Sequence, residues 1–159
     1  MYKLSNKDYK SRIEKFLERQ RFMKSVGITL DTIEEGTIEA SLQLKEEHLQ
    51  QTGLVHGGVI ATIADIVAGL AAYTLVQKDS HVVTADLKIS YLNPGRGQVL
   101  YARGWVLKQG YRLNFCEAEV YAIDGGNKKM IAKCTATMAT VFPEDLNRQE
   151  TSNKEKGFG

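Results

Sequence analysis

Apolar residues recur with two different periods along the chain, and each period predicts one kind of element. Ile13, Phe16 and Leu17 have the spacing of one helical face, which predicts an amphipathic helix over about residues 5–25. A second helix is expected over residues 57–76, which are apolar almost throughout and carry a single charge. A helix that is apolar on nearly all sides is typical of one that the rest of the protein covers.

Alternation of apolar and polar side chains predicts strands in the remaining segments. The expected strands are 28–34, 37–44, 81–93, 98–108, 112–123 and 128–141. Turn-forming residues separate them, most clearly Asn93-Pro94-Gly95 and Asp124-Gly125-Gly126-Asn127. Consecutive strands joined by tight turns are expected to pair in an antiparallel sheet, whose buried face the apolar helix has to cover. The predicted fold class is α+β: a curved antiparallel sheet wrapped around one long central helix, with an extra helix at the N-terminus.

Length and composition suit one globular domain. The chain has 159 residues, of which 43% are hydrophobic and 25% charged, and these values exclude a disordered or collagen-like protein. We expect a single domain over residues 1–143, followed by a polar tail over residues 144–159 that is expected to be flexible.

The charge balance and the N-terminal sequence exclude several partners. Twenty-one basic residues stand against 19 acidic ones, an excess too small to indicate nucleic-acid binding. The first ten residues are polar and contain no apolar core of a signal peptide, so we expect a cytoplasmic protein. The apolar segment 57–76 is long enough to cross a membrane, but Asp65 at its centre would cost about 2.5–3.5 kcal/mol there. No membrane association is therefore expected.

The cysteines and histidines do not form a metal-binding pattern. Cys116 and Cys134 make no CxxC pair, and the three histidines lie far apart, so no metal site is expected. A two-residue turn at 125–126 would place the two thiols on opposite faces of a hairpin, which excludes a disulfide unless a bulge shifts the register. The sequence also lacks a G-x-S-x-G elbow, a P-loop and a dinucleotide fingerprint, and no cofactor is expected.

The start of the apolar helix carries the most informative residues. Gly57 and Gly58 would expose backbone N–H groups that have no partner within a helix, and such an N-terminus suits an anion or a developing oxyanion. Close packing is the alternative role for the two glycines. Asp65 lies in the same helix between apolar neighbours, where a carboxylate is costly unless it is solvated, paired or functional.

The spacing of these residues predicts a site that two chains share. Gly57 and Asp65 are eight residues apart, or about 12 Å along a helix. One chain cannot present both groups to one carbonyl carbon, so acyl-transfer chemistry would take Gly57 from one protomer and Asp65 from another. His56 and Asp65 are nine residues apart and face opposite sides of the helix, which argues against a His–Asp pair within one chain.

The sequence His56-Gly57-Gly58, followed by Asp65, resembles the hotdog-fold acyl-CoA thioesterases of the phenylacetate-pathway (PaaI) type. Residues 83–94, with the sequence VTADLKISYLNP, resemble the strand that follows the helix in that family. The resemblance covers roughly residues 30–141. It implies hydrolysis of an acyl-CoA thioester to the free acid and CoA, by a homodimer or homotetramer and without a cofactor.

The resemblance also implies a role for each residue of the motif. The Gly57 N–H polarises the thioester carbonyl, and Asp65 of the partner chain acts as general base on water or as nucleophile. Thr84 matches a family position that holds the attacking water. Gln50 matches a position that is Asn in several members and orients the substrate or the acid. His56 shapes the turn or bonds near the thioester.

The remaining substrate contacts are expected at the ends of the strands and helices. Gly58 is expected to bind substrate beside Gly57. Arg96, Lys108 and Arg112 are candidates for the CoA phosphates, because the predicted turns place them near a cleft mouth. The central helix and the strand after it would line an acyl pocket, which Phe22 and Met23 could close.

Two other functions remain open at this point. A non-catalytic acyl-CoA-binding protein could use the same fold, although the chain has no length for an output domain. A hydratase or dehydratase would need a histidine paired with an acid in one site, and only His56 lies near.

Overall fold

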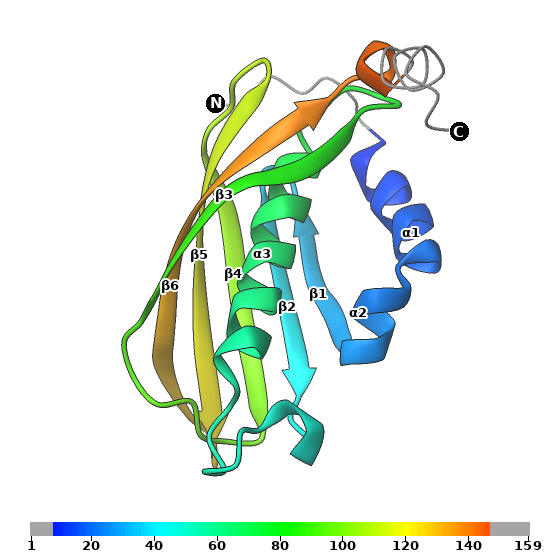
Figure 1. Cartoon of the computed structure of the whole chain (residues 1–159). Helices are drawn as coiled ribbons and strands as arrows, with labels where there is room; N and C mark the ends of the chain where they lie inside the picture. The colour runs from blue at the N-terminus through cyan, green and yellow to red at the C-terminus, as the bar shows by residue number, and fades with distance from the viewer. Residues whose placement is uncertain (1–7, 147–159) are drawn as a thin grey trace, which may run out of the picture.

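One antiparallel sheet of six strands forms the frame of the protein in a computed structural model, which describes residues 8–146 (Figure 1). The strands are β1 (Ile28–Glu34), β2 (Thr37–Gln43), β3 (His81–Tyr91), β4 (Val99–Lys108), β5 (Leu113–Asp124) and β6 (Asn127–Val141). Their order in the sheet is β1-β2-β4-β5-β6-β3, and every neighbouring pair is antiparallel. The predicted α+β class and the strand positions are confirmed, with each strand end within two residues of its predicted place.

The strand order corrects one expectation. β3 and β4 follow each other in the chain but are not neighbours, since β3 pairs with β6 at the sheet edge and β4 lies between β2 and β5. The segment with Asn93-Pro94-Gly95 therefore crosses the end of the sheet instead of forming a hairpin. The cause is the helix between β2 and β3, which carries the chain across the sheet before β3 begins.

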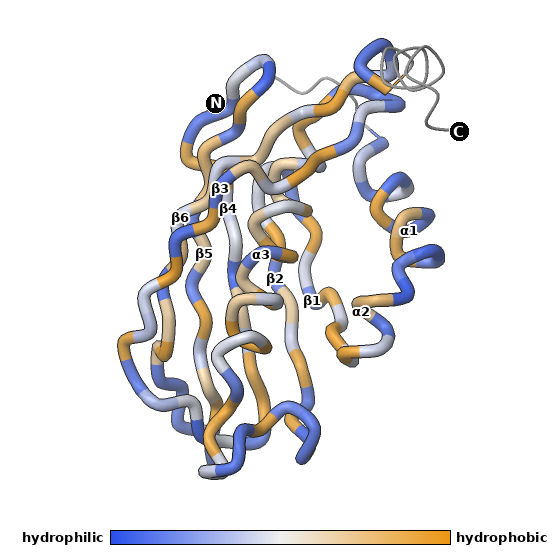
Figure 2. Tube along the Cα trace, in the orientation of Figure 1, coloured by the Kyte–Doolittle hydropathy of each residue, from blue (hydrophilic) through white to orange (hydrophobic). Residues whose placement is uncertain are grey.

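This helix, α3 (Gly57–Tyr73), lies across the concave face of the sheet. Its buried residues are Ile60, Ile63, Ala64, Val67, Ala68, Leu70, Ala71 and Ala72. Apolar and polar residues alternate along the strands (Figure 2), and alternate positions of β2, β4 and β5 are buried. The closest approach is at Gly104 of β4, where a Cβ atom would lie 2.5 Å from the backbone carbonyl carbon of Val67. Among residues 8–146 no helix is long and apolar enough to cross a membrane.

The N-terminal helix is broken, which the sequence pattern did not predict. α1 (Tyr9–Arg19) and α2 (Arg21–Val26) are separated at Gln20, whose ψ of 84° is not helical. Ile13 and Met23, ten residues apart, would lie about 80° apart around one continuous helix. The break lets both side chains become buried, with exposures of 0% and 4%. Gly27 ends α2 at a φ of 90°, a left-handed conformation that suits glycine, and residues 5–7 of the predicted helix lie outside the described residues.

A β-bulge overturns the prediction for the two thiols. Asp124 pairs with Asn127 as expected, but a register shift at Val120/Tyr121 sets Cys116 opposite Ala136. Cys116 and Cys134 therefore face the same side of the sheet, each is 1% exposed, and both are free thiols. Burial is the main cause that raises the pKa of Cys116 to about 12 and that of Cys134 to about 11. Such thiols are unreactive structural residues.

Candidate functional site

The first turn of α3 leaves one backbone N–H available at the surface. His56 is the N-cap: its Nδ1 accepts a hydrogen bond from the Gly58 N–H at 2.9 Å. Its carbonyl oxygen accepts from the N–H groups of Val59 and Ile60. Of the four N–H groups that a helix start leaves unpaired, only that of Gly57 has no acceptor within residues 8–146. The unpaired Gly57 N–H therefore presents the partial positive charge of the helix N-terminus to the solvent.

The two glycines beside this N–H group have different neighbours. A Cβ atom at Gly58 would lie 3.1 Å from His56 Nδ1, so a side chain there would crowd the capping imidazole. Gly57 lies against the ring of Tyr91, whose hydroxyl donates to the Gly57 carbonyl at 3.0 Å. Tyr91 therefore holds the helix start in place from the end of β3.

A cavity of about 430 Å³ opens beside Gly57. Its walls come from the loop before α3, the first turn of α3 and the segment after β3. The lining residues are Gln50, Leu54, Val55, Gly57, Ile60, Tyr91, Leu92, Asn93, Pro94 and Gly95. The structure therefore brings Gln50 and Gly57 to one cavity, two residues that the sequence placed in the same site.

Asp65 and Thr84 form a second constellation, further along α3. The Thr84 hydroxyl donates a hydrogen bond of 2.7 Å to Asp65 Oδ1. A β-bulge between Thr84 and Asp86 marks this point of β3, and bulges are common beside functional sites because they redirect side chains. The carboxylate keeps its second oxygen free of any hydrogen bond to the described residues, so it can bind water.

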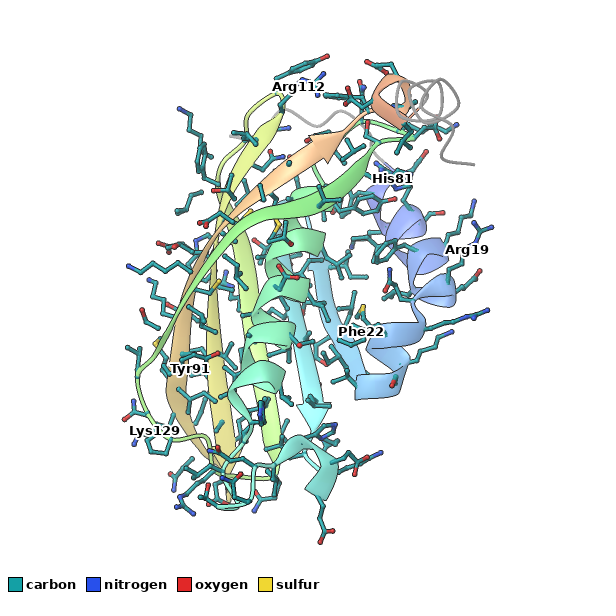
Figure 3. All side chains as sticks on the ribbon, in the orientation of Figure 1. Arg19, Phe22, His81, Tyr91, Arg112 and Lys129 are labelled. Atoms are coloured by element: carbon teal, nitrogen blue, oxygen red, sulfur yellow. The ribbon has the colours of Figure 1, made fainter. Side chains whose placement is uncertain are left out.

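A second cavity, of about 160 Å³, lies beside this pair. Most of its walls are apolar and come from α1, α2, α3 and the ends of β3 and β6. The lining residues are Phe16, Gln20, Phe22, Met23, Asp65, Ile66, Gly69, Leu70, Tyr73, His81, Val82, Thr84 and Met138. Phe22 lies on the side of α2 that faces α3 (Figure 3), and Phe22, Met23 and Asp65 line the same cavity.

The candidate phosphate-binding residues are divided between the two ends of the molecule. Arg96 is exposed and follows Gly95, which lines the cavity at Gly57. Arg112 lies at the end opposite Tyr91 (Figure 3), where it makes a bidentate ion pair with Asp145 at 2.9 and 3.3 Å. Lys108 closes β4 close to Arg112, since it pairs with Phe115 near the start of β5. Within one chain, Arg96 therefore lies beside the Gly57 cavity, whereas Lys108 and Arg112 lie at the opposite end of the molecule.

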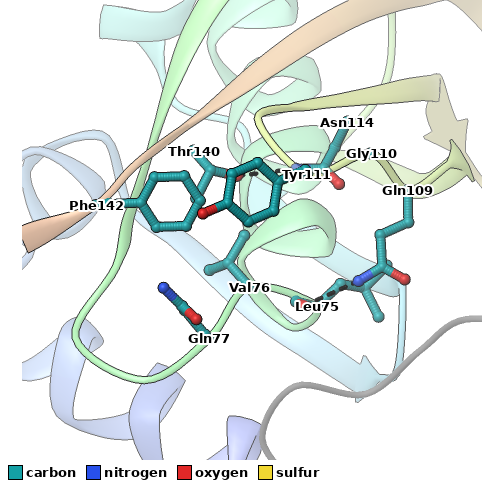
Figure 4. Close-up of a pocket in the computed structure, with 9 residues that line it drawn as sticks. All are labelled: Leu75, Val76, Gln77, Gln109, Gly110, Tyr111, Asn114, Thr140 and Phe142. Carbon is teal, nitrogen blue, oxygen red and sulfur yellow. Dashed lines mark hydrogen bonds between the residues drawn. The ribbon is translucent and has the colours of Figure 1, made fainter. Parts of the chain in front are cut away.

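A third cavity, of about 370 Å³, lies beyond the C-terminal end of α3 (Figure 4). Uncharged side chains line it, among them Asn114, which is 1% exposed and donates to Thr140 Oγ1 at 3.3 Å. Asn114 Oδ1 has no hydrogen-bond partner within residues 8–146. None of the residues predicted for the site lines this cavity.

Sequence reasoning missed Tyr91 as a contact of Gly57 and Phe16, Gly69 and Met138 as walls of the Asp65 cavity. Tyr91 stood within the segment that carried the family resemblance, but its contact depends on where β3 passes α3. The alternating pattern of β3 and the helical period of α3 predict which side of its element each residue lies on. They do not predict where β3 crosses α3.

Comparison with known proteins identifies the family. Residues 52–129 match the family model described as the thioesterase superfamily. A crystal structure of a thioesterase family protein from Silicibacter pomeroyi is 30% identical, with a TM-score of 0.83 over 84% of this chain and 98% of that one. Acyl-coenzyme A thioesterase 13 of Homo sapiens is 28% identical over 110 residues, which are 68% of this chain and 78% of the relative.

The PaaI protein of Escherichia coli has the same fold, with a TM-score of 0.73 and 21% identity over 87% of this chain and 96% of that one. These matches confirm the resemblance to hotdog thioesterases of the PaaI type.

Proposed function

The chain belongs to the thioesterase superfamily and is a thioester hydrolase, and on this premise we propose that it hydrolyses an acyl-CoA thioester at a site shared by two protomers. The observation that carries the proposal is the division of the reactive groups. Gly57 opens into one cavity and Asp65 with Thr84 into another, and neither of these two cavities contains both Gly57 and Asp65. Each chain thus supplies two different half-sites.

The edge strand β3 offers a way to join the half-sites. It is exposed along most of its length, and one of its edges has no partner strand within residues 8–146. Thr84 of β3 contacts Asp65, and Tyr91 of the same strand contacts Gly57. Two β3 strands paired antiparallel about an axis near Leu87 and Lys88 would set Thr84 of one chain opposite position 91 of the other. This pairing would bring Gly57 of one protomer to Asp65 of its partner.

In this mechanism the Gly57 N–H donates to the thioester oxygen, on which negative charge develops as the carbonyl carbon becomes tetrahedral. Asp65 takes a proton from water, whose oxygen attacks the carbonyl carbon, or attacks that carbon itself before water completes the hydrolysis. In either route the C–S bond breaks when the tetrahedral intermediate collapses, and the CoA thiolate leaves and takes up a proton from the protonated Asp65 or from water. Thr84 fixes the orientation of the carboxylate.

Four further residues support the reaction indirectly or bind substrate. His56 acts through its cap on α3, and Gly58 serves that cap because its N–H is already bound to His56. Gln50 lines the Gly57 cavity and can bind the substrate carbonyl or an amide of the pantetheine arm. Arg96 is the best placed cation for the CoA phosphates, since it flanks the same cavity.

The Asp65→Asn variant tests this proposal. The amide keeps the size of the carboxylate but cannot accept a proton, so kcat for thiol release should fall by about 10²–10⁴. Binding of acyl-CoA, followed by calorimetry, should persist, because the groups that hold the substrate are unchanged. A wild-type protein that binds acyl-CoA without releasing thiol would favour the non-catalytic alternative.

A further inference from the structure

We infer that the cavity of about 160 Å³ beside Asp65 is the acyl pocket and that it admits only compact acyl groups, with Gly69 and Phe22 setting the limit. The inference rests on the proposed function. It assigns the substrate class: a single-ring acyl group or a straight chain of about six carbons. Longer chains have to leave the cavity past Phe22.

The polarity of the cavity gives the direction of the bound acyl group. Asp65 and Thr84, the groups that would meet the thioester, are half-buried and exposed respectively. Met23, Leu70 and Met138 are buried, with exposures of 4%, 5% and 0%. An acyl group whose carbonyl lies at Asp65 would therefore extend toward these buried apolar side chains, where each buried methylene is favourable.

Anchored side chains form the wall beneath α1. The rings of Phe16 and Tyr73 pack with their centroids 5.5 Å apart. The Arg12 guanidinium lies 4.5 Å from the centroid of the Tyr73 ring and donates to the carbonyl oxygen of Val76 at 2.9 Å. These contacts tie α1 to the end of α3, so this wall cannot recede to admit a longer chain.

The volume sets the size of the ligand. An apolar cavity of about 150 Å³ is known to hold one benzene molecule. The cavity beside Asp65 has about the same volume, and most of its lining residues are apolar. It therefore fits six ring carbons, or a chain of about that number.

Two lining residues allow the size to be changed in opposite directions. A Cβ atom at Gly69 would lie 3.9 Å from Met138 Sδ, an ordinary contact, so Gly69→Ala adds a methyl group to the cavity without strain. Phe22 is 59% exposed although it lines the cavity, which places it at the rim. Phe22→Ala should open the rim without disturbing the buried core.

The test measures kcat/KM for thiol release from acetyl-, hexanoyl-, benzoyl-, decanoyl- and palmitoyl-CoA. The wild-type protein should prefer the hexanoyl and benzoyl substrates over palmitoyl-CoA by about tenfold or more. Gly69→Ala should lower kcat/KM about tenfold for these two substrates and less than about twofold for acetyl-CoA. Phe22→Ala should raise the decanoyl value relative to the hexanoyl value.

The matched control is Phe115→Ala, which removes a phenylalanine that is 44% exposed and lies outside every cavity described above. It should leave the substrate profile unchanged. An equal loss for all substrates in Gly69→Ala, or wild-type use of palmitoyl-CoA as readily as hexanoyl-CoA, would overturn the size limit while leaving the thioesterase function standing. Failure of the wild-type protein to release thiol from every substrate would overturn the proposed function and this inference together.

Discussion

The proposed hydrolysis depends on a single backbone group, the N–H of Gly57, which would donate to the thioester oxygen. His56 binds the other three N–H groups of the first turn of α3, through its side chain and its carbonyl oxygen. The cap thus stabilises the helix and leaves a single donor where a thioester oxygen would develop charge. Capping by Nδ1 requires an imidazole that carries no proton on that nitrogen.

Gly57→Pro tests this donor without a change of fold. Proline is well tolerated at the first position of a helix, and His56 before it already has an extended backbone, with φ −62° and ψ 134°. The variant removes the N–H, so kcat should fall by about 10²–10³, as for the loss of one oxyanion-hole donor. Gly57→Ala is the control, because it brings a side chain toward Tyr91 but keeps the N–H. Equal activities of the two variants would show that the Gly57 N–H takes no part in the reaction.

At this scale the sequence pointed to the polar residues of the candidate site and not to the side chains around them. Gly57, Asp65 and Thr84 could be singled out because a glycine pair at the start of an apolar helix and a carboxylate within it are conspicuous, and because the next strand matched a family pattern. Tyr91 and Gly69 could not, since an aromatic residue in a strand and a glycine in a helix have many ordinary roles. Only the crossing of β3 and α3 shows what they contact.

Among the elements, the packing of α3 on β4 positions both half-sites. The two backbones meet at Gly104, in the part of α3 that follows Asp65. Any side chain at position 104 would push the helix away from the sheet. Such a shift would move Asp65 and Gly57 relative to β3, which holds their partners Thr84 and Tyr91.

Gly104→Ala should therefore destabilise the protein by about 1–3 kcal/mol or more, because overpacking against backbone atoms has no flexible side chain to relieve it. The measurement is the free energy of unfolding from urea denaturation. Gly69→Ala is the matched control: its Cβ atom meets Met138 at an ordinary distance, so the fold should keep its stability or gain some. Equal stabilities of the two variants would contradict the close approach at Gly104.

The boundaries of the strands followed from the sequence, whereas the arrangement of the elements did not. Nearby residues determine where a strand ends, since turn residues such as Asp124-Gly125-Gly126-Asn127 stop the alternating pattern. Two irregularities depend on tertiary packing instead. The bulge at Val120/Tyr121 places Cys116 and Cys134 on the same buried face of the sheet. The break at Gln20 allows both Ile13 and Met23 to become buried. The position of β3 beyond β6 likewise depends on how α3 crosses the sheet.

For the molecule as a whole, burial of ionisable groups predicts a loss of stability in alkali. Burial raises the pKa of Cys116 from 9.0 to about 12 and that of Cys134 from 9.0 to about 11. Burial is also the main cause that raises the pKa of the Tyr101 hydroxyl from 10.0 to about 12. The unfolded chain loses these protons at lower pH than the folded chain does. Their contribution is therefore fully present below about pH 9 and is lost as the pH rises toward 11 and 12.

The urea midpoint, measured at intervals from pH 8 to pH 11, should stay level up to about pH 9 and then fall. Cys116→Ala should flatten this fall, because it removes the most strongly shifted thiol. A midpoint that stays constant to pH 11 in the unaltered protein would contradict the burial of these groups.

The shared site is the central claim, and complementation between two inactive variants tests it most directly. Asp65→Asn and Gly57→Pro protein would be unfolded together in equal amounts, refolded, and assayed for thiol release from acyl-CoA. A mixed dimer has one site with both defects and one with an intact Gly57 and an intact Asp65. Random pairing should therefore restore about a quarter of the wild-type activity. If each chain held a complete site, the mixture would stay as inactive as the two variants alone, and that result would contradict the account.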